Sequence, residues 1–142
     1  MSDEQSKNEI MVIQPNVEAA VSTMHAFQQL KARLLDPGDT VEISGKKYIK
    51  RSGWRKIALA FNISIEIVSV EREKIDNTYI VRVKARATAP NGRVSEEVGV
   101  CDSSEFSGNI KSSYHNVEAK ATTRAINRAI SNLVGGGELS AE

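Results

Sequence analysis

The sequence has only one cysteine, two histidines, three prolines and one tryptophan, and it has no long apolar run. Because Cys101 has no second cysteine to join, the chain cannot form an internal disulfide, which suits a reducing compartment. A stretch of about 18 apolar residues, as a membrane span requires, is missing. The polar start of the chain also lacks the apolar core of a secretory signal. We therefore expect a cytoplasmic protein that contacts no membrane.

The residues that usually carry catalysis are also scarce. One cysteine and two scattered histidines are too few for a tetrahedral zinc site. The Gly-x-x-x-x-Gly-Lys-Ser/Thr loop that cradles nucleotide phosphates is missing as well. The sequence thus predicts a protein that is not an enzyme and uses no cofactor. A metal-dependent nuclease built on Asp102, Glu105 and His115 is an alternative, although these residues also suit capping and turn roles.

Positive and negative charges are nearly balanced. The chain has 19 Lys and Arg against 18 Asp and Glu, for a net charge of +1. Its 142 residues most simply form one domain. A chain of this kind binds nucleic acid only if folding gathers its cations on one surface.

We expect a disordered N-terminal arm over residues 1–12, a domain over residues 13–137 and a flexible tail over residues 138–142. From Pro15 to Leu34, apolar residues recur at three- and four-residue steps, which is typical of an amphipathic helix. A change in apolar parity near Ile67 predicts a β-bulge or a strong twist. The other expected elements are a hairpin over 41–51 that turns at Ser44 and Gly45, a short helix over 55–61, strands over 63–73, 79–89 and 93–101, and a helix over 116–134 that ends at Gly135, Gly136 and Gly137.

The clearest expected element is the hairpin of residues 79–101. Its first strand alternates apolar with basic or polar side chains, and Asn91 and Gly92 favour a two-residue turn. With that turn, the register pairs Ala89 with Val94, Thr88 with Ser95, Arg86 with Glu97, Ala85 with Val98 and Val83 with Val100. The sequence therefore predicts an α+β fold. An antiparallel β-meander and a long C-terminal helix packed on the sheet form a β-β-β-α core, preceded by an N-terminal helix and a small β-hairpin.

The long helix carries a row of cations. Lys120, Arg124 and Arg128 follow one another at four-residue steps, and no acidic residue lies in the row. Like charges at this spacing disfavour an isolated helix, so a bound anion would explain them. A solvated helix face, bridged to Glu96 or Glu97 of the hairpin, is the alternative.

A second row lies on the strand over 79–89, where Arg82, Lys84 and Arg86 share one face. In the expected register Glu97 lies opposite Arg86, whereas Arg82 and Lys84 have no such partner. An exposed sheet face with ordinary solvated charges is the alternative.

The third basic cluster is the segment KKYIKRSGWRK, residues 46–56. It holds six cations and no acidic residue: Lys46, Lys47, Lys50, Arg51, Arg55 and Lys56. Cations interleaved with Tyr48 and Trp54 are typical of surfaces that bind single-stranded nucleic acid, where phosphates meet charge and bases stack on rings. The alternative role for Trp54 is that of a buried anchor.

Two stretches of the sequence resemble a known family. The expected meander ends in the segment EEVGVCDSSE, residues 96–105, and the next helix contains EAKATTRAINRAI, residues 118–130. With Gly53-Trp54 ahead of the sheet, these segments are similar to the core of the Rad-fifty-two-type single-strand annealing proteins. That core has an acidic-Val-Gly-Tyr-Gly segment, a helix rich in Glu, Lys, Ala and Thr, and a Gly-Trp dipeptide. The resemblance extends over residues 54–135 and includes small archaeal and phage-like members.

The resemblance implies a β-β-β-α core that assembles into oligomeric rings or arcs. It also implies that single-stranded DNA lies in a basic groove between the meander and the long helix. Arg128 falls on a basic position of the family's helix. Asn127 stands where the family has lysine, Arg124 falls on a position that is not basic there, and the short helix after Trp54 is a further departure.

We therefore expect a protein that binds single-stranded DNA and promotes annealing of complementary strands without ATP, in recombination or repair. The expected groove residues are Arg82, Lys84, Arg86, Arg124 and Arg128, with Lys120 beside them, and the segment 46–56 is expected to form a second basic surface with Trp54 as a stacking ring. The expected partners are DNA, further copies of the chain and recombination proteins. The alternatives are a passive single-strand binder or recombination accessory, the nuclease, and a structural oligomerisation module.

Overall fold

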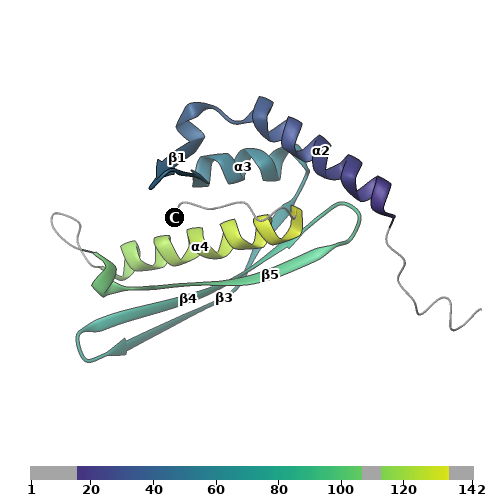
Figure 1. Cartoon of the computed structure of the whole chain (residues 1–142). Helices are drawn as coiled ribbons and strands as arrows, with labels where there is room; N and C mark the ends of the chain where they lie inside the picture. Colours follow the sequence, from purple (N-terminus) through teal and green to yellow (C-terminus); the bar gives the residue numbers. More distant parts are fainter. Residues whose placement is uncertain (1–15, 107–112, 135–142) are drawn as a thin grey trace, which may run out of the picture. The chain divides into compact units, whose positions relative to one another are not determined.

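A computed structural model describes residues 16–106 and 113–134 of the chain (Figure 1). The expected arm over residues 1–12, the three glycines after the long helix and the tail over residues 138–142 lie outside the described residues. The chain forms two compact units, Met1–Arg33 and Leu34–Glu142, so a boundary falls inside the expected single domain. Within residues 16–106 and 113–134, every helix is too short or too polar to cross a membrane.

The first unit contributes the helix α2, Val17–Leu34, as the apolar periodicity predicts. The helix starts after Asn16, whose side-chain oxygen accepts a hydrogen bond from the Ala19 N–H at 3.0 Å. Near the start of α2, Val17 and Val21 remain exposed, with 66% and 49% of their surface accessible. The apolar stripe of α2 is therefore only partly buried.

The second unit has three layers, and its α+β class is the predicted one. Its antiparallel sheet has the order β3-β4-β5, formed by β3 (Ser64–Ile75), β4 (Thr78–Thr88) and β5 (Val94–Asp102). One face of the sheet is covered by α4 (Tyr114–Val134), and α3 (Arg51–Ala60) packs on α4 (Figure 1). The remaining elements are the hairpin of β1 (Thr40–Ile43) and β2 (Lys46–Ile49) and two short 3-10 helices, η1 (Pro37–Asp39) and η2 (Ser103–Glu105). The helix α3 begins earlier than the sequence predicts, directly after β2.

The core lies between α4 and the sheet and consists largely of small side chains. On β4 the inward residues Val81, Val83, Ala85 and Ala87 are completely buried. Their counterparts on α4 are Ala121, Ala125 and Ala129, which are also completely buried. Small side chains on both surfaces let the helix backbone approach the strands closely.

The helix comes closest at Gly99 on β5. A Cβ atom at this position would clash with the backbone of α4 at the Ala121 oxygen and the Ala125 nitrogen, and it would lie 2.9 Å from the Cβ of Arg124. Backbone atoms cannot swing aside as a flexible side chain can. Position 99 therefore requires glycine for a packing reason.

The β4–β5 register differs from the predicted one by one residue. Thr88 pairs with Val94, Arg86 with Glu96 and Ala85 with Glu97. The prediction placed Asn91 and Gly92 in a two-residue turn, which needs positive φ at both positions. In the structure only Gly92 has positive φ, at 89°, and its N–H donates to the Ala89 oxygen at 2.9 Å. Pro90 favours this three-residue loop because its fixed φ suits the second position of a type I turn.

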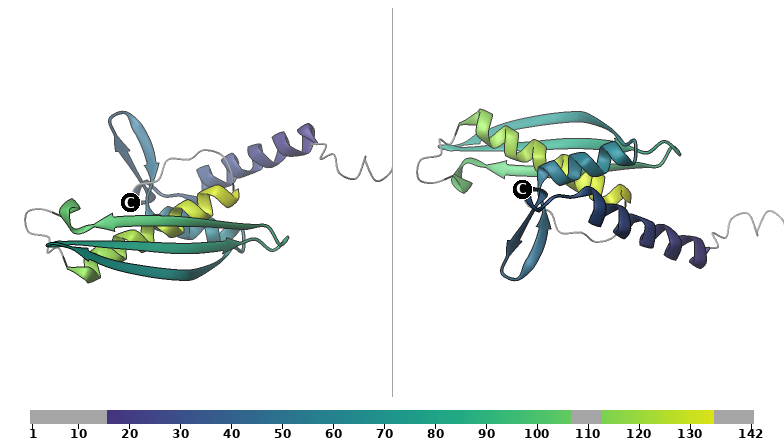
Figure 2. Two further views of the ribbon diagram at one scale, coloured as in Figure 1. Left: turned by 90° about the horizontal axis from the view of Figure 1, so that it is seen from below. Right: turned by 90° about the horizontal axis from the view of Figure 1, so that it is seen from above.

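A shift of one residue turns every side chain of β5 to the other face. Gly99 and Cys101 face α4, while Val94, Val98 and Val100 lie on the open face and are 53%, 40% and 40% exposed. The left view of Figure 2 shows this open face, across which no described helix of the second unit lies. The predicted bulge on β3 is confirmed, because its register with β4 shifts between Ile67 and Ser69.

The contact at position 99 makes a testable prediction. Gly99→Ala should destabilise the protein by about 3 kcal/mol or more, because the added methyl group meets helix backbone rather than a movable side chain. Thermal unfolding followed by circular dichroism should show a midpoint lower by on the order of 10 °C.

Gly38→Ala is the matched control. A Cβ atom at Gly38 would have no heavy atom within 4 Å, so this substitution should leave the unfolding midpoint nearly unchanged. Equal midpoints for the two variants would show that α4 does not lie as close to β5 as described.

Candidate nucleic-acid interface

The strand row lies on the open face of the sheet, where its charges are matched by neighbouring carboxylates. Arg82 pairs with Glu73 of β3 at 3.0 Å. The sequence analysis gave Arg82 and Lys84 no partner and paired Arg86 with Glu97. These predictions are wrong, because the real register brings Glu96 opposite Arg86. The other pairs are Lys84 with Glu96 at 3.3 Å and Arg86 with Glu96 at 2.7 Å and with Glu66 at 3.1 Å.

These ion pairs change the protonation behaviour of the row. Hydrogen bonds from Arg86 and then Lys84 lower the pKa of Glu96, and the bond to Glu96 raises the pKa of Arg86. Exposed ion pairs of this kind add little to stability, because water screens them. Their larger effect is to reduce the positive potential that a DNA strand would meet on this face.

The helix row runs along the opposite face, beside β5. Arg124 pairs with Glu105 of η2 at 2.6 Å, and its guanidinium also donates to the Val100 oxygen at 2.6 Å. Arg128 donates to the Val98 oxygen at 3.0 Å. Lys120 lies 3.9 Å from the same Glu105 carboxylate. The row thus has an acidic partner after all, supplied by a residue outside the helix.

The two rows do not form one groove within a single chain. Side chains at Arg82, Lys84 and Arg86 point away from α4, because the residues between them on β4 are buried beneath it. Arg124 and Arg128 lie on the helix-covered side. The sheet itself separates the two rows, so the expected continuous groove between the meander and the long helix is not present in the second unit. Asn127, which stands where the resembled family has lysine, is completely buried.

The acidic residues proposed for a nuclease have capping roles instead. Asp102 accepts a hydrogen bond from the Ser104 N–H at 2.9 Å, and Glu105 accepts one from the Asp102 N–H at 3.1 Å. Glu105 is held by Arg124, and His115 is exposed at the start of α4. Among the described residues, no three His, Cys, Asp or Glu side chains gather as metal ligands would. Cys101 is buried in the core beneath α4, and this burial raises the pKa of its thiol to about 11.

The basic segment of β2 and α3 differs from both rows. Five of its cations are exposed and form no ion pair with any Asp or Glu of the described residues: Lys46, Lys47, Lys50, Arg51 and Arg55. Glu42, the cross-strand neighbour of Lys47, is the nearest acidic position on β1, yet the two side chains do not form an ion pair. We call these five residues the basic surface; Lys46 and Lys47, as neighbours on β2, lie on opposite faces of the hairpin. It is the largest group of unmatched cations in the part of the chain that the structure describes.

The position of these cations is unfavourable for the helix itself. Lys50 is the N-cap of α3 without a side-chain capping bond, and Arg51 lies in a first turn that has no acidic residue. Cations at a helix N-terminus oppose the helix dipole, and Arg51 and Arg55 repel each other one turn apart. An anion bound here would relieve both effects.

Two members of the segment have structural roles. Lys56 binds the buried carboxylate of Asp39 at 2.6 Å and the exposed carboxylate of Asp36 at 3.0 Å. Its hydrogen bond to Asp39 lowers the pKa of that carboxyl to about 2. Trp54 is completely buried, so its predicted role as a stacking ring is wrong and the alternative role of a core anchor is confirmed. Asp39 was missed by the sequence analysis, because it is 17 residues from Lys56 and belongs to no periodic pattern.

The second unit thus belongs to the class of α+β domains in which a helix covers one face of an antiparallel meander. Searches against protein-family models and against curated proteins found no match to this chain.

The Arg124–Glu105 pair predicts how stability depends on pH. Because Arg124 lowers the pKa of Glu105 from 4.5 to about 2, the carboxylate stabilises the fold fully above about pH 4.5, and this contribution is lost as the pH falls toward 2. Glu105→Gln should therefore make the free energy of unfolding less dependent on pH in this window. Urea unfolding at several pH values measures this dependence, and Arg124→Gln should reduce it in the same way. If the free energy of unfolding changed with pH as steeply in both variants as in the wild type, the ion pair would be contradicted.

Proposed function

We propose that this chain is a cytoplasmic single-stranded DNA-binding protein that promotes annealing of complementary strands without ATP. The observation that carries the proposal is the basic surface, five exposed cations on β2 and α3 without a carboxylate partner in the described residues. In a chain of net charge +1, such a concentration of unmatched charge favours binding of a polyanion.

The mode of binding follows from the kind of groups that the surface offers. Lysine and arginine side chains neutralise phosphates and release counterions, which gives affinity for any sequence. The basic surface offers little ring area for continuous stacking, because Trp54 is buried and Tyr48 on β2 is half-buried. Bases of a bound strand would therefore stay free to pair with a complement, as annealing requires.

The annealing activity itself rests on the resemblance to the Rad-fifty-two-type proteins. The β-β-β-α order and the helix packed on the sheet agree with what that resemblance implies. The proposed groove does not, since the strand row and the helix row lie on opposite faces and are paired with carboxylates. We therefore assign DNA binding to the basic surface. Assembly into a ring or arc would repeat that surface, so that weak contacts add along one strand.

A passive single-strand binder or recombination accessory is the second candidate. It is favoured by the same separation of the rows, because the described residues offer one surface of unmatched cations, which holds one strand. Both candidate functions, the annealing protein and the passive binder, are compatible with contacts to other recombination proteins.

DNA binding through the basic surface predicts a specific salt dependence. The triple variant Lys46→Gln, Lys47→Gln, Lys50→Gln should bind a single-stranded oligonucleotide more weakly, and its slope of log affinity against log salt should be shallower by about 2, at roughly 0.7 per lost phosphate contact. Fluorescence anisotropy with a labelled oligonucleotide at several salt concentrations measures both quantities.

The matched control is the triple variant Arg82→Gln, Lys84→Gln, Arg86→Gln, which removes the same number of charges from the open face of the sheet. It should change the affinity and the slope much less, because its cations are already matched by carboxylates. Equal losses in both variants would show that net charge alone attracts DNA. A wild-type chain that fails to shift DNA at low salt would favour a purely structural module.

Annealing predicts a faster reaction between complementary strands. Two complementary oligonucleotides carrying a fluorophore and a quencher should form duplex faster with the chain than without it, and ATP should make no difference. The Lys46, Lys47, Lys50 triple variant should lose the acceleration. If the chain binds each strand tightly but leaves the rate unchanged or lowers it, the passive binder is the correct candidate.

A further inference from the structure

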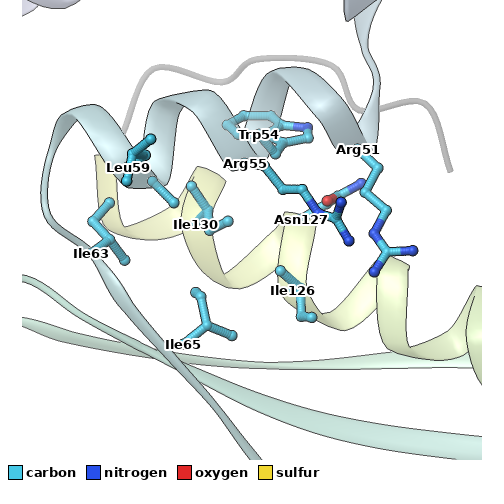
Figure 3. A pocket seen from close by; sticks show the side chains of 10 residues that line it. Arg51, Trp54, Arg55, Leu59, Ile63, Ile65, Ile126, Asn127 and Ile130 are labelled. Atoms are coloured by element: carbon cyan, nitrogen blue, oxygen red, sulfur yellow. The ribbon is translucent and has the colours of Figure 1, made fainter.

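A cavity of about 340 Å³ lies beside the basic surface, where α3, α4 and the start of β3 meet (Figure 3). Its volume is near the lower end of the range of about 300–1,000 Å³ that is typical of small-ligand sites. All of its walls belong to the second unit. Neither the two rows of cations nor the basic segment of residues 46–56 indicated a cavity at this place.

The cavity has one apolar part and one cationic part. Aliphatic side chains form the apolar part: Ala58, Leu59, Ile63, Ile65, Ile126 and Ile130. Arg51 and Arg55 extend from α3 toward Ile126 and Asn127 at the other end (Figure 3). Trp54 contributes to the wall but is completely buried, so it offers no ring face to a ligand.

The cationic end belongs to the basic surface. Arg51, Arg55 and Leu59 follow one another at four-residue steps, so they line one side of α3, and all three are exposed. Leu59 has 79% of its surface accessible, so its side chain is open to a ligand at the mouth of the cavity. A ligand that satisfies this side of α3 needs an apolar part for Leu59 and an anionic part for the two arginines.

We propose that the cavity takes one unstacked base of a bound DNA strand, while Arg51 and Arg55 hold the phosphate next to it. The base lies on the aliphatic wall, and a guanidinium plane covers its other face, as arginine does on flat π-systems. This inference rests on the proposed DNA binding and adds one base contact per chain to it, so that the other bases of the bound strand stay free to pair. The further cations Lys46, Lys47 and Lys50 favour a strand of nucleic acid over an acidic peptide, because each nucleotide of such a strand carries both a phosphate for the cations and a flat base for the apolar part of the cavity.

The test compares two single-stranded oligonucleotides of equal length, one of thymidines and one of abasic sites, which carry equal charge. The full chain should bind the thymidine strand about tenfold or more tightly, since each held base adds to affinity. A strand with one 2-aminopurine should also become brighter on binding, because the base leaves its stacked neighbours.

Ile126→Trp is designed to fill the cavity. It should bring the thymidine-to-abasic affinity ratio close to one and abolish the 2-aminopurine signal, with the affinity for the abasic strand unchanged. Because Ile126 is partly buried, Leu59→Gln serves as a second variant at an exposed position, and it should lower the ratio in the same direction. Circular dichroism confirms that both variants are folded.

A pair of double variants separates the cavity from the rest of the basic surface. Arg51→Gln with Arg55→Gln should weaken binding of both strands and also lower the affinity ratio. Lys46→Gln with Lys47→Gln removes the same charge and should weaken both strands while keeping the ratio.

Each remaining outcome contradicts a different step. Equal, salt-dependent binding of thymidine and abasic strands would overturn the base pocket and leave the proposed DNA binding intact. Failure of both strands to bind at low salt would overturn the proposed function as well. Binding of an acidic peptide that alternates Asp and Leu, in competition with neither strand, would assign the cavity to a protein partner.

Discussion

The contact between α4 and the sheet is made through residues with almost no side chain. Ala121 and Ala125 pass over Gly99, and the helix backbone lies so near β5 that a single methyl group would not fit. Long side chains on α4 must therefore extend sideways from the helix, past the surface that faces the sheet. Arg124 does so on the β5 side, where it reaches a backbone oxygen, and Glu118 does so on the β3 side, where it pairs with Arg72 at 2.5 Å. The closeness of the helix thus decides which of its charges can face a ligand.

Three clusters of cations that look alike in the sequence have three different environments in the fold. The strand row is neutralised by the glutamates of β3 and β5, and the helix row is held by Glu105 and the backbone of β5. The basic surface keeps its charge because Glu42 is the one acidic residue within the strands of the β1–β2 hairpin and α3. A nearly neutral chain can therefore present one strongly positive surface, although most of its cations serve to hold the fold together.

Local patterns predicted the elements well, and distant contacts explain where the prediction failed. Periodicity gave the helices, the meander and the bulge near Ile67, because each depends on neighbours a few residues away. The predicted register of β5 was wrong because Pro90 favours a different turn from the one that Asn91 and Gly92 favour. Pairs such as Arg124 with Glu105 are 19 residues apart and leave no periodic signal. The cavity joins three elements, and neither composition nor spacing could show that they meet there.

The arginines that reach β5 have one more consequence. A strand at the border of a sheet normally offers its outward oxygens to any other extended chain, and this is how many proteins begin to form fibres. Here the guanidinium groups of Arg124 and Arg128 already occupy the Val100 and Val98 oxygens, and the irregularity at Ile67 interrupts the other border. Both edge strands are thus poor templates for a further strand. Copies of this protein in a concentrated solution are therefore hindered from joining their sheets edge to edge.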